Sequence, residues 1–396
     1  MNESTALFIR SHADDDVRQL ALRGAGDIAV DLPFALDQIA GRQTARRKLP
    51  TWAATEGIVY PPRLSMEQCS SEATARYKQY LAQQIVHCTS SNDTFVDLTG
   101  GFGVDFSFLA RGFARAVYVE RQQHLCDIAA ANFQLLDLPQ AEVVCCEAED
   151  YLRDMAPARL IYADPARRDH HGMRTYALSD CQPDVVALRP LLLAKGVRVM
   201  LKLSPMLDWR KAVADIGAAH VREVHVVSID NECKELLLIM GDGEGFRLVC
   251  VNDDSVFECG KDSPLPLTGM PREGQFLYEP NASIMKTGCF GSLSQQFDVR
   301  QIASDSHLFV ADERVNGFPG REFVIDAIST MSKRSLRTTL GGLGRANIAV
   351  RNFPLSVADL RRRLKLSEGG STYLFATTLA DKSHVLLITR KPCTEP

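Results

Sequence analysis

The stretch Thr94-Phe-Val-Asp97-Leu-Thr-Gly100-Gly101-Phe-Gly103-Val-Asp105 decides the fold. An apolar run that reads as a strand leads into a glycine-rich turn, and a helix, a second strand and the acid Glu120 follow. This order predicts a nucleotide-binding βαβ unit, because glycines let the backbone come close to a ligand and the acid can accept both ribose hydroxyls. Phe106 stands where the dinucleotide pattern Gly-x-Gly-x-x-Gly has its third glycine. An NAD site and an ordinary βαβ turn are the alternatives.

Composition narrows the class of protein. The 396 residues leave room for two or three domains, and no apolar run approaches the length that crosses a membrane. The first residues lack the pattern of a signal peptide. The eleven cysteines are scattered and never spaced Cys-x-x-Cys, which favours reduced thiols and argues against zinc or a disulfide framework. We therefore expect a cytoplasmic protein without a metal.

Charge is distributed unevenly along the chain. The formal net charge is −4, yet from Lys333 onward twelve basic residues stand against four acidic ones, so residues 1–332 carry −12. Such asymmetry indicates a C-terminal module that meets a polyanion, and nucleic acid is the interpretation we favour. A solvated helix face is the alternative.

Hydrophobic periodicity predicts helices first and then an α/β sheet. Residues 1–90 read as mostly helical, with a loop around Trp52 and a serine cap at Ser70 and Ser71 before a long helix. Strands are expected at 94–98, 116–120, 141–146, 160–164, 197–203, 223–229 and 236–240, and helices at 104–111, 122–135, 149–155, 180–194 and 208–216. This order predicts a mostly parallel sheet with a final antiparallel hairpin, and a ligand at the carboxyl ends of the strands.

The last third of the chain is organised differently. Residues 241–264 are rich in turn formers and read as a join, and residues 276–323 read as a compact piece. From about residue 323 the pattern is β-α-β-α-β-β, with elements expected at 323–328, 332–340, 346–350, 357–364, 372–378 and 385–389.

Seven segments resemble one known family. The glycine-rich stretch, Tyr162-Ala-Asp164-Pro165-Ala-Arg167-Arg168 and Lys202-Leu-Ser-Pro205-Met are similar to bacterial class I S-adenosylmethionine (SAM)-dependent methyltransferases with a ferredoxin-like insert and a C-terminal THUMP-like domain. Segments that match the later domains are Tyr278-Glu-Pro-Asn-Ala-Ser-Ile-Met-Lys286, Phe318-Pro-Gly-Arg321, Asn352-Phe-Pro-Leu355 and Thr372-Tyr-Leu-Phe-Ala-Thr-Thr378. The catalytic part also resembles, more distantly, the trimethylguanosine synthase-like RNA guanine-N2 methyltransferases.

The resemblance implies both a fold and a division into domains. It implies a Rossmann-like class I methyltransferase sheet at residues 91–243, preceded by the helical region 1–90. Two small α+β domains would follow, ferredoxin-like at 270–323 and THUMP-like at 324–396.

SAM is the cofactor that the resemblance implies. Asp97, Gly101 and Gly103 would surround its methionine part and ribose, and Glu120 would bind the ribose hydroxyls. Class I enzymes hold the adenine amino group with an acid after the third strand, where Glu147 fits best, although a plain surface acid is the alternative. Asp164 would line the same site. Three further residues could reach the cofactor's carboxylate or simply cap their helix: Gln68, Ser70 and Ser71.

The stretch Asp164-Pro165-Ala166-Arg167 resembles the Asp/Asn-Pro-Pro-Tyr/Phe signature of amino-group methyltransferases. There an acidic or amide side chain and a backbone carbonyl accept hydrogen bonds from the target amine, and positioning supplies most of the rate. We therefore assign Asp164, Pro165 and Arg167 to catalysis. Arg167 replaces the aromatic ring, so it would stack on a base or pair with phosphate, unless Arg167 and Arg168 serve structural ion pairs with Asp169 or Asp180.

Two neighbouring regions extend this candidate site. Cys181 is the nearest thiol for carbon-5 methylation of a pyrimidine, a route that we regard as secondary because no base stands beside it. Lys202, Ser204 and Asp208 follow the fifth strand and would line the same rim.

The basic residues of the last domain predict contact with RNA, either tRNA or rRNA. THUMP-like domains in relatives suggest RNA, and phosphate contacts would explain the charge. Arg361 and Lys365 are four apart, so a helix would show both on one face. The predicted RNA-binding residues are Arg351, Arg361, Arg362, Arg363 and Lys365.

The sequence thus predicts a SAM-dependent methyltransferase that acts on RNA at a base nitrogen. One alternative is methylation of a small molecule or a protein side chain. A second is a non-catalytic protein that binds SAM and RNA, which the altered Asp164-Pro165-Ala166-Arg167 signature keeps open.

Overall fold

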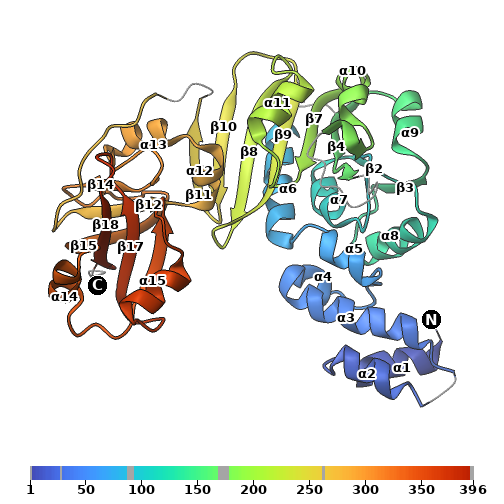
Figure 1. Cartoon of the computed structure of the whole chain (residues 1–396). Coiled ribbons are helices and arrows are strands. Elements are labelled where there is room, and N and C mark those ends of the chain that lie inside the picture. The colour runs from blue at the N-terminus through green and yellow to red at the C-terminus, as the bar shows by residue number, and fades with distance from the viewer. Residues whose placement is uncertain (1, 27–28, 87–92, 168–177, 261–263, 393–396) are drawn as a thin grey trace. The chain divides into compact units, whose positions relative to one another are not determined.

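A computed structural model of the chain describes residues 2–26, 29–86, 93–167, 178–260 and 264–392. It divides into two compact units (Figure 1). The first unit contains Met1–Val224 and Lys234–Gly245, and the second contains His225–Cys233 and Phe246–Pro396. Arg168 and Asp169, for which the sequence left an ion-pair role open, lie outside the described residues.

The first unit begins with helices, as the sequence predicted. They are α1 (Glu3–Ser11), α2 (Val17–Arg23), α3 (Leu32–Lys48), α4 (Pro50–Ala54), α5 (Arg63–Gln68) and α6 (Glu72–Val86). The loop expected around Trp52 is wrong, because Pro50 starts the short helix α4, where its missing N–H costs nothing. Trp52 is buried, and its indole Nε1 donates to Ser107 Oγ at 3.3 Å, which fixes the helical region to α7 (Val104–Leu109).

A largely parallel sheet forms the core of the first unit. Its strands are β1 (Thr94–Asp97), β2 (Arg115–Glu120), β3 (Ala141–Cys145), β4 (Ala158–Ala163), β7 (Gly196–Leu203) and β9 (Glu232–Gly241). Their order is β3-β2-β1-β4-β7-β9, and only β9 runs antiparallel to its neighbour in this series. Each strand lies within two residues of its expected bounds, apart from the longer start of β9. The mostly parallel sheet with an antiparallel end is thereby confirmed.

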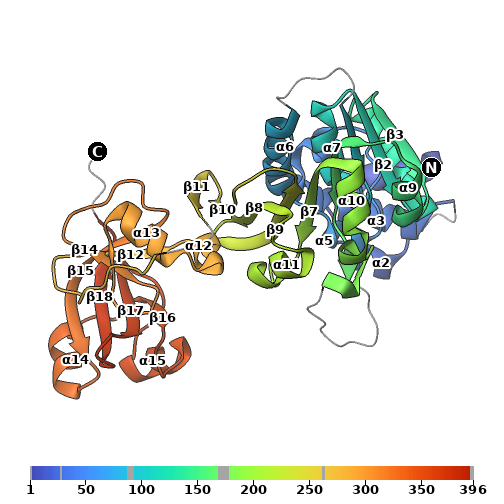
Figure 2. The ribbon, with the colours of Figure 1, turned by 90° about the horizontal axis from the view of Figure 1, so that it is seen from above.

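Helices cover both faces of this sheet (Figure 2). α6, α7 (Val104–Leu109) and α8 (Gln123–Leu135) pack on one face, and α9 (Ala148–Asp154), α10 (Val185–Lys195) and α11 (Trp209–Ile216) on the other. The helix expected from residue 180 begins later, because Asp184 caps α10 by accepting from the backbone N–H groups of Val186 and Ala187. The residues before it form a short turn and β6 (Cys181–Gln182), which pairs with β5 (Ala166–Arg167).

The turn predicted at Asp230-Asn231-Glu232 connects β8 (Val221–Ile229) with β9. Asp230 and Asn231 have φ values of 53° and 59°. Two successive left-handed residues suit a tight hairpin, and Asp and Asn tolerate this conformation better than most side chains.

The second unit opens with a hairpin that the sequence did not reveal. The expected join contains β10 (Arg247–Asn252) and β11 (Ser255–Cys259), which pair antiparallel across a turn where Asp253 has φ 52°. The turn formers of this stretch indicate a join, whereas the apolar run Leu248-Val-Cys-Val251 between them is short and forms β10 by pairing with β11.

One seven-stranded sheet unites the rest of the second unit. Its order is β13-β14-β12-β15-β18-β17-β16. These strands are β12 (Phe276–Pro280), β13 (Arg300–Gln301), β14 (Phe309–Ala311), β15 (Gly320–Thr330), β16 (Asn347–Arg351), β17 (Thr372–Thr378) and β18 (His384–Arg390). β12 and β15 pair over five residues, so the expected boundary between residues 323 and 324 falls inside a strand of a shared sheet. The helices α12 (Ala282–Thr287) and α13 (Phe290–Phe297) precede β13.

The helices α14 (Lys333–Leu340) and α15 (Val357–Leu364) lie on one face of that sheet. Leu336 and Leu360 belong to one apolar cluster with Leu374 of β17 and Leu386 of β18. Both helices begin at a serine cap and show basic side chains outward.

Candidate active site

A pocket lies at the carboxyl ends of β1, β2, β3 and β4. The glycine-rich stretch after β1 forms its floor, and α5 and the two residues that follow it, Cys69 and Ser70, border it. This is the position that the topology of a parallel sheet predicts for a ligand. All of the expected cofactor residues are found there: Asp97, Gly101, Gly103, Glu120, Glu147 and Asp164.

The glycines have different physical reasons to be glycine. Gly101 and Gly103 have φ values of 54° and 84°, in the left-handed region that glycine adopts without strain. At Gly100 the reason is space, because a Cβ would lie 2.2 Å from the ring of Tyr118. The Tyr118 hydroxyl donates to the carbonyl oxygen of Gly101, so β2 holds the bend in place.

Two buried acids flank the loop. Glu120 at the end of β2 accepts hydrogen bonds from the backbone N–H groups of Gly101 at 3.0 Å and Gln122 at 2.9 Å. Asp97 at the end of β1 is 1% exposed and accepts from the backbone N–H of Thr99 at 2.9 Å. Each carboxylate oxygen has two lone pairs, so both acids keep capacity for a ligand.

The environment of Asp97 opposes its ionisation. Burial, reinforced by the charges of Asp105 and Asp164, raises the pKa of Asp97 well above its usual range, although the hydrogen bond from Thr99 counteracts this. The site therefore concentrates negative charge that a bound cation would relieve.

Thr99 connects the glycine loop with the loop after β4. Its hydroxyl accepts the backbone N–H of Asp164 at 2.7 Å. A glycine, which the motif often has here, could not make this contact. Thr99 therefore sets the position of Asp164 relative to the cofactor loop.

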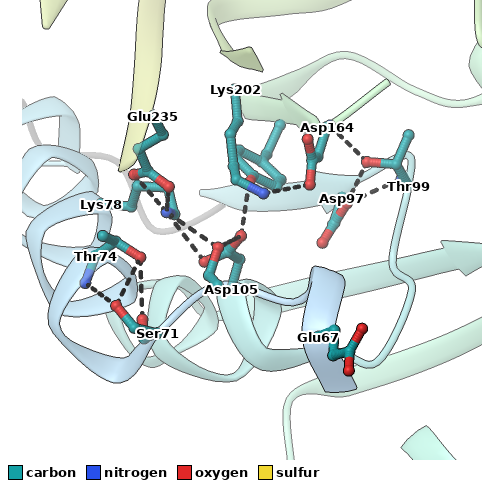
Figure 3. Close-up of polar contacts among 12 residues, drawn as sticks. Glu67, Ser71, Thr74, Lys78, Asp97, Thr99, Asp105, Asp164, Lys202 and Glu235 are labelled. Atoms are coloured by element: carbon teal, nitrogen blue, oxygen red, sulfur yellow. Dashed lines mark hydrogen bonds and ion pairs between the residues drawn. The ribbon is translucent and has the colours of Figure 1, made fainter. Parts of the chain in front are cut away.

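Asp164 and Lys202 form an ion pair at the pocket rim (Figure 3). Lys202 Nζ lies 2.5 Å from Asp164 Oδ2, and the side chains are 13% and 39% exposed. Burial lowers the pKa of Lys202, but the charges of Asp164, Asp105 and Glu235 outweigh it and raise the pKa above its ordinary value. Lys202 thus stays charged and orients Asp164, with the carboxylate partly open to the pocket.

Behind the pocket lies a buried charge network that we name the Lys78 network: Lys78, Asp105 and Glu235 (Figure 3). Lys78 of α6 is fully buried, and its Nζ lies 2.6 and 2.7 Å from the two carboxylate oxygens of Glu235 and 3.2 Å from Asp105 Oδ1. Asp105 Oδ2 accepts from the hydroxyls of Ser70 and Tyr162, each at 2.7 Å. The network joins α6, α7, β4 and β9.

Other predicted residues have mixed outcomes. Glu147 is exposed at the start of α9 and lines the pocket, as do Gln68 and Ser70, whereas Ser71 accepts the backbone N–H of Thr74 at 3.3 Å as a helix cap. Cys181 is buried in β6 rather than at a helix start, and it is absent from the described lining of the pocket.

The motif after Asp164 is placed only in part. Pro165 is half-buried and directly precedes β5. The backbone of Arg167 pairs with Cys181 in the β5–β6 ribbon. Its proposed stacking role stays a prediction.

Charge selects among the ligands that this pocket could hold. Among its described lining residues six are acidic and one, Arg121, is basic. Such a lining repels the pyrophosphate of NAD and attracts a ligand with positive groups. SAM has a sulfonium and an ammonium beside one carboxylate, so the residues present fit it.

The basic residues predicted to bind RNA lie in three different settings. Arg351 pairs with the buried Glu279, which Arg321 also binds, so two of the family segments and the residue before a third meet at one ion-pair cluster. Arg361 is half-buried and donates to the carbonyl of Ala346 at 3.4 Å.

The remaining three predicted RNA contacts are exposed. Arg362 pairs with Asp359 at 2.8 Å, and Arg363 lies on the outer side of α15. Lys365 follows the helix end with φ 56°, so the expected shared helical face with Arg361 is wrong.

Within the described residues no cluster of His, Cys, Asp and Glu could hold a metal ion. Among those same residues, no helix is long and apolar enough to cross a membrane.

Comparisons with known proteins agree with this fold. Residues 276–319 match a family described as a ferredoxin-like domain, and residues 320–391 match one described as THUMP domain-like. A crystal structure from Porphyromonas gingivalis W83, assigned as a methyltransferase, is 31% identical with TM-score 0.86, covering 99% of this chain and 98% of that one. No curated protein matches.

Two more distant structures resemble only part of the chain. An O-methyltransferase from Bacillus cereus in complex with SAH is 14% identical with TM-score 0.35, covering 52% of this chain and 97% of that one. An rRNA methylase from Streptococcus thermophilus is 13% identical with TM-score 0.32, covering 42% and 95%.

The sheet order and the acidic pocket at its carboxyl edge define a class I methyltransferase. The 31% sequence identity to the Porphyromonas gingivalis structure extends over 99% of this chain. It shows that the chain belongs to the bacterial SAM-dependent methyltransferases with ferredoxin-like and THUMP-like domains. With the family, the enzyme class and the SAM cofactor that the sequence predicted are confirmed.

Sequence reasoning missed the Lys78 network. Asp105 stands in the glycine-rich stretch without an evident role, and no motif marks Glu235. One signal was present: Lys78 stands within the buried stripe Thr74, Ala75, Lys78, Leu81 and Ala82 of α6, where an unpaired lysine would be costly.

Proposed function

We propose that this enzyme methylates RNA at a base nitrogen. The observation that carries the RNA assignment is the outer surface of α14 and α15. Its exposed charged side chains are basic except for one acid, Asp359. We name these residues the basic helix surface: Lys333, Arg334, Arg337, Arg362 and Arg363. Clustered lysines and arginines without acidic partners bind phosphates through charge and release of counterions.

Asp164 supports a nitrogen target. Its carboxylate is 39% exposed at the pocket rim, while Lys202 binds one of its oxygens. An ionised carboxylate accepts hydrogen bonds from an amine and aims the nitrogen toward the bound methyl donor. SAM, when bound, supplies an already activated methyl group, so the chain's own task is to position the amine and exclude water.

Comparing modified nucleosides tests the substrate. We expect one methylated nucleoside to disappear from total RNA when the gene is deleted. The wild-type gene should restore it, and Asp164→Ala should not, because no acceptor would hold the amine. RNA that stays fully methylated without the gene would contradict the proposal and favour a small molecule or a protein as the acceptor.

A charge reversal tests the RNA contact. R334E/R337E/R363E should weaken binding to total tRNA or rRNA at least tenfold and lower the salt dependence, by roughly one unit of log–log slope for each phosphate that is no longer bound. The matched control is R10E/R18E/R23E, which reverses three exposed arginines on α1 and α2. Equal effects of both variants would mean that the basic helix surface has no special role.

A further inference from the structure

The hydrogen-bonding capacity of the Asp105 carboxylate is only partly satisfied within the protein. Oδ2 accepts from Ser70 and Tyr162, but the buried Oδ1 accepts no hydrogen bond. Its neighbour Lys78, 3.2 Å away, directs its short contacts to Glu235 instead. The Asp105 side chain is 11% exposed and lines the pocket. Asp105 is thus an acid of the pocket lining whose capacity to accept hydrogen bonds is not fully used by the protein.

The balance of charges around Asp105 also favours a positively charged ligand group. Lys78 and Glu235 balance one another, so Asp105 is the surplus negative charge of the Lys78 network. Burial raises the pKa of Asp105, but Lys78, Lys202 and the hydrogen bonds from Ser70 and Tyr162 outweigh burial and leave it below the ordinary value. Asp105 is therefore ionised where it meets the pocket.

The chemistry of the cofactor distinguishes between its two positive groups. A sulfonium has no hydrogen to donate, whereas the α-ammonium has three N–H donors. An ionised acceptor without a donor is satisfied by the ammonium and not by the sulfonium.

We propose that Asp105 binds the α-ammonium of the cofactor's methionine part and that Lys78 and Glu235 hold its carboxylate in place. The plainer role, an acid in the first turn of α7, accounts for its position in the helix. It does not account for a buried lysine, a tyrosine and a serine converging on one side chain. The proposal rests on SAM as the cofactor and is independent of whether the acceptor is RNA.

Three ligands test the proposal by isothermal titration calorimetry. SAM has the ammonium, the carboxylate and the sulfonium charge, decarboxylated SAM lacks only the carboxylate, and 5′-methylthioadenosine lacks all three. S-adenosylhomocysteine, which keeps the ammonium without the sulfonium charge, is the control whose binding should weaken as that of SAM does. Asp105→Asn should weaken the binding of SAM and of decarboxylated SAM at least tenfold, as expected for loss of a charged hydrogen bond. The affinity for 5′-methylthioadenosine should change less than twofold. Asp150→Asn is the matched control, since Asp150 is an exposed acid of α9 paired with Arg153.

Each other outcome overturns the assignment. Equal losses for all three ligands would make Asp105 a structural residue, and no loss for any would show that it does not touch the cofactor. Loss of affinity for SAM alone would shift the contact to the carboxylate end.

If Asp105→Asn does not fold, Ser70→Ala and Tyr162→Phe remove the two hydroxyl donors of Asp105. Both variants should weaken the binding of SAM and leave that of 5′-methylthioadenosine unchanged. Unchanged SAM affinity in both would reject the proposal. RNA enters none of these measurements, so failure here is separate from failure of the proposed substrate.

Discussion

The two units of this enzyme use charged side chains in opposite ways. In the first unit Lys78, Asp105 and Glu235 are buried and hold one another, and Lys202 holds Asp164. On the basic helix surface of the second unit, arginines and lysines are exposed and largely uncompensated. Buried pairs fix geometry and are costly to break, whereas exposed charges add little stability and remain available to a partner. Position therefore decides whether a charge builds a site or presents a surface.

Breaking the Lys78 network gives the largest expected effect. Lys78→Met leaves Glu235 buried without its cation, so we expect a loss of about 3–5 kcal/mol in the free energy of unfolding. Urea titration with tryptophan fluorescence measures it for the first unit, which contains both tryptophans, Trp52 and Trp209.

Two companion variants sharpen this result. Lys211→Met, which removes an exposed pair with Asp215, should cost less than about 1 kcal/mol. Lys78→Met combined with Glu235→Leu should recover part of the loss, because an apolar pair tolerates burial. Similar costs for Lys78→Met and Lys211→Met would remove the distinction between the two kinds of charge.

Asp97→Asn should change the free energy of unfolding by less than Lys78→Met does, and should increase it. The folded-state pKa of Asp97 lies above its unfolded value, so its contribution to stability is complete below the unfolded pKa. That contribution is lost as pH rises through the folded pKa, by at most about 1.4 kcal/mol per pH unit for one proton. Asparagine does not titrate, so the free energy of unfolding of the variant should increase relative to the wild type as the pH rises above the unfolded pKa of about 4.

Urea titrations at several pH values measure this gain, and calorimetry with SAM should show that the same variant binds the cofactor more weakly. A stability difference between Asp97→Asn and the wild type that stays constant with pH would contradict the raised pKa. A gain that grows with pH, together with weaker SAM binding, would instead show that the acid is retained for function at a cost to the fold.

The smallest effect is expected on the basic helix surface. Arg363→Ala should change the thermal stability of the second unit by less than about 0.5 kcal/mol, because the side chain is exposed and alanine favours a helix. Thermal denaturation followed by circular dichroism tests this. A large loss would show that Arg363 belongs to the packing of its unit and not to a surface kept for a partner.

The sequence predicted the first-unit sheet well because each apolar run is bounded by a clear turn. The strand before Asp97 and the glycines after it need no long-range information to be recognised. The α4 helix around Trp52 and the β10–β11 hairpin were missed, since prolines and turn formers also occur at the ends of short elements.

Long-range pairing was beyond the sequence. Nothing local in Tyr278 or Glu322 shows that β12 and β15 are hydrogen-bonded neighbours. For the same reason the residues that face the pocket were predictable from the loops after each strand. The Lys78 network was not, because Lys78 of α6 and Glu235 of β9 lie far from Asp105 in the sequence. The roles of the individual site residues stay predictions.

The pairing of β12 with β15 has a consequence for how this protein can be taken apart. A cut near residue 320 would separate two recognised modules but expose the edges of both strands, with unpaired N–H and C=O groups along each. Such halves would be prone to aggregate. Grafting onto another enzyme would therefore require the entire segment from β12 to β18, and in evolution the two modules are expected to travel together as a single heritable piece.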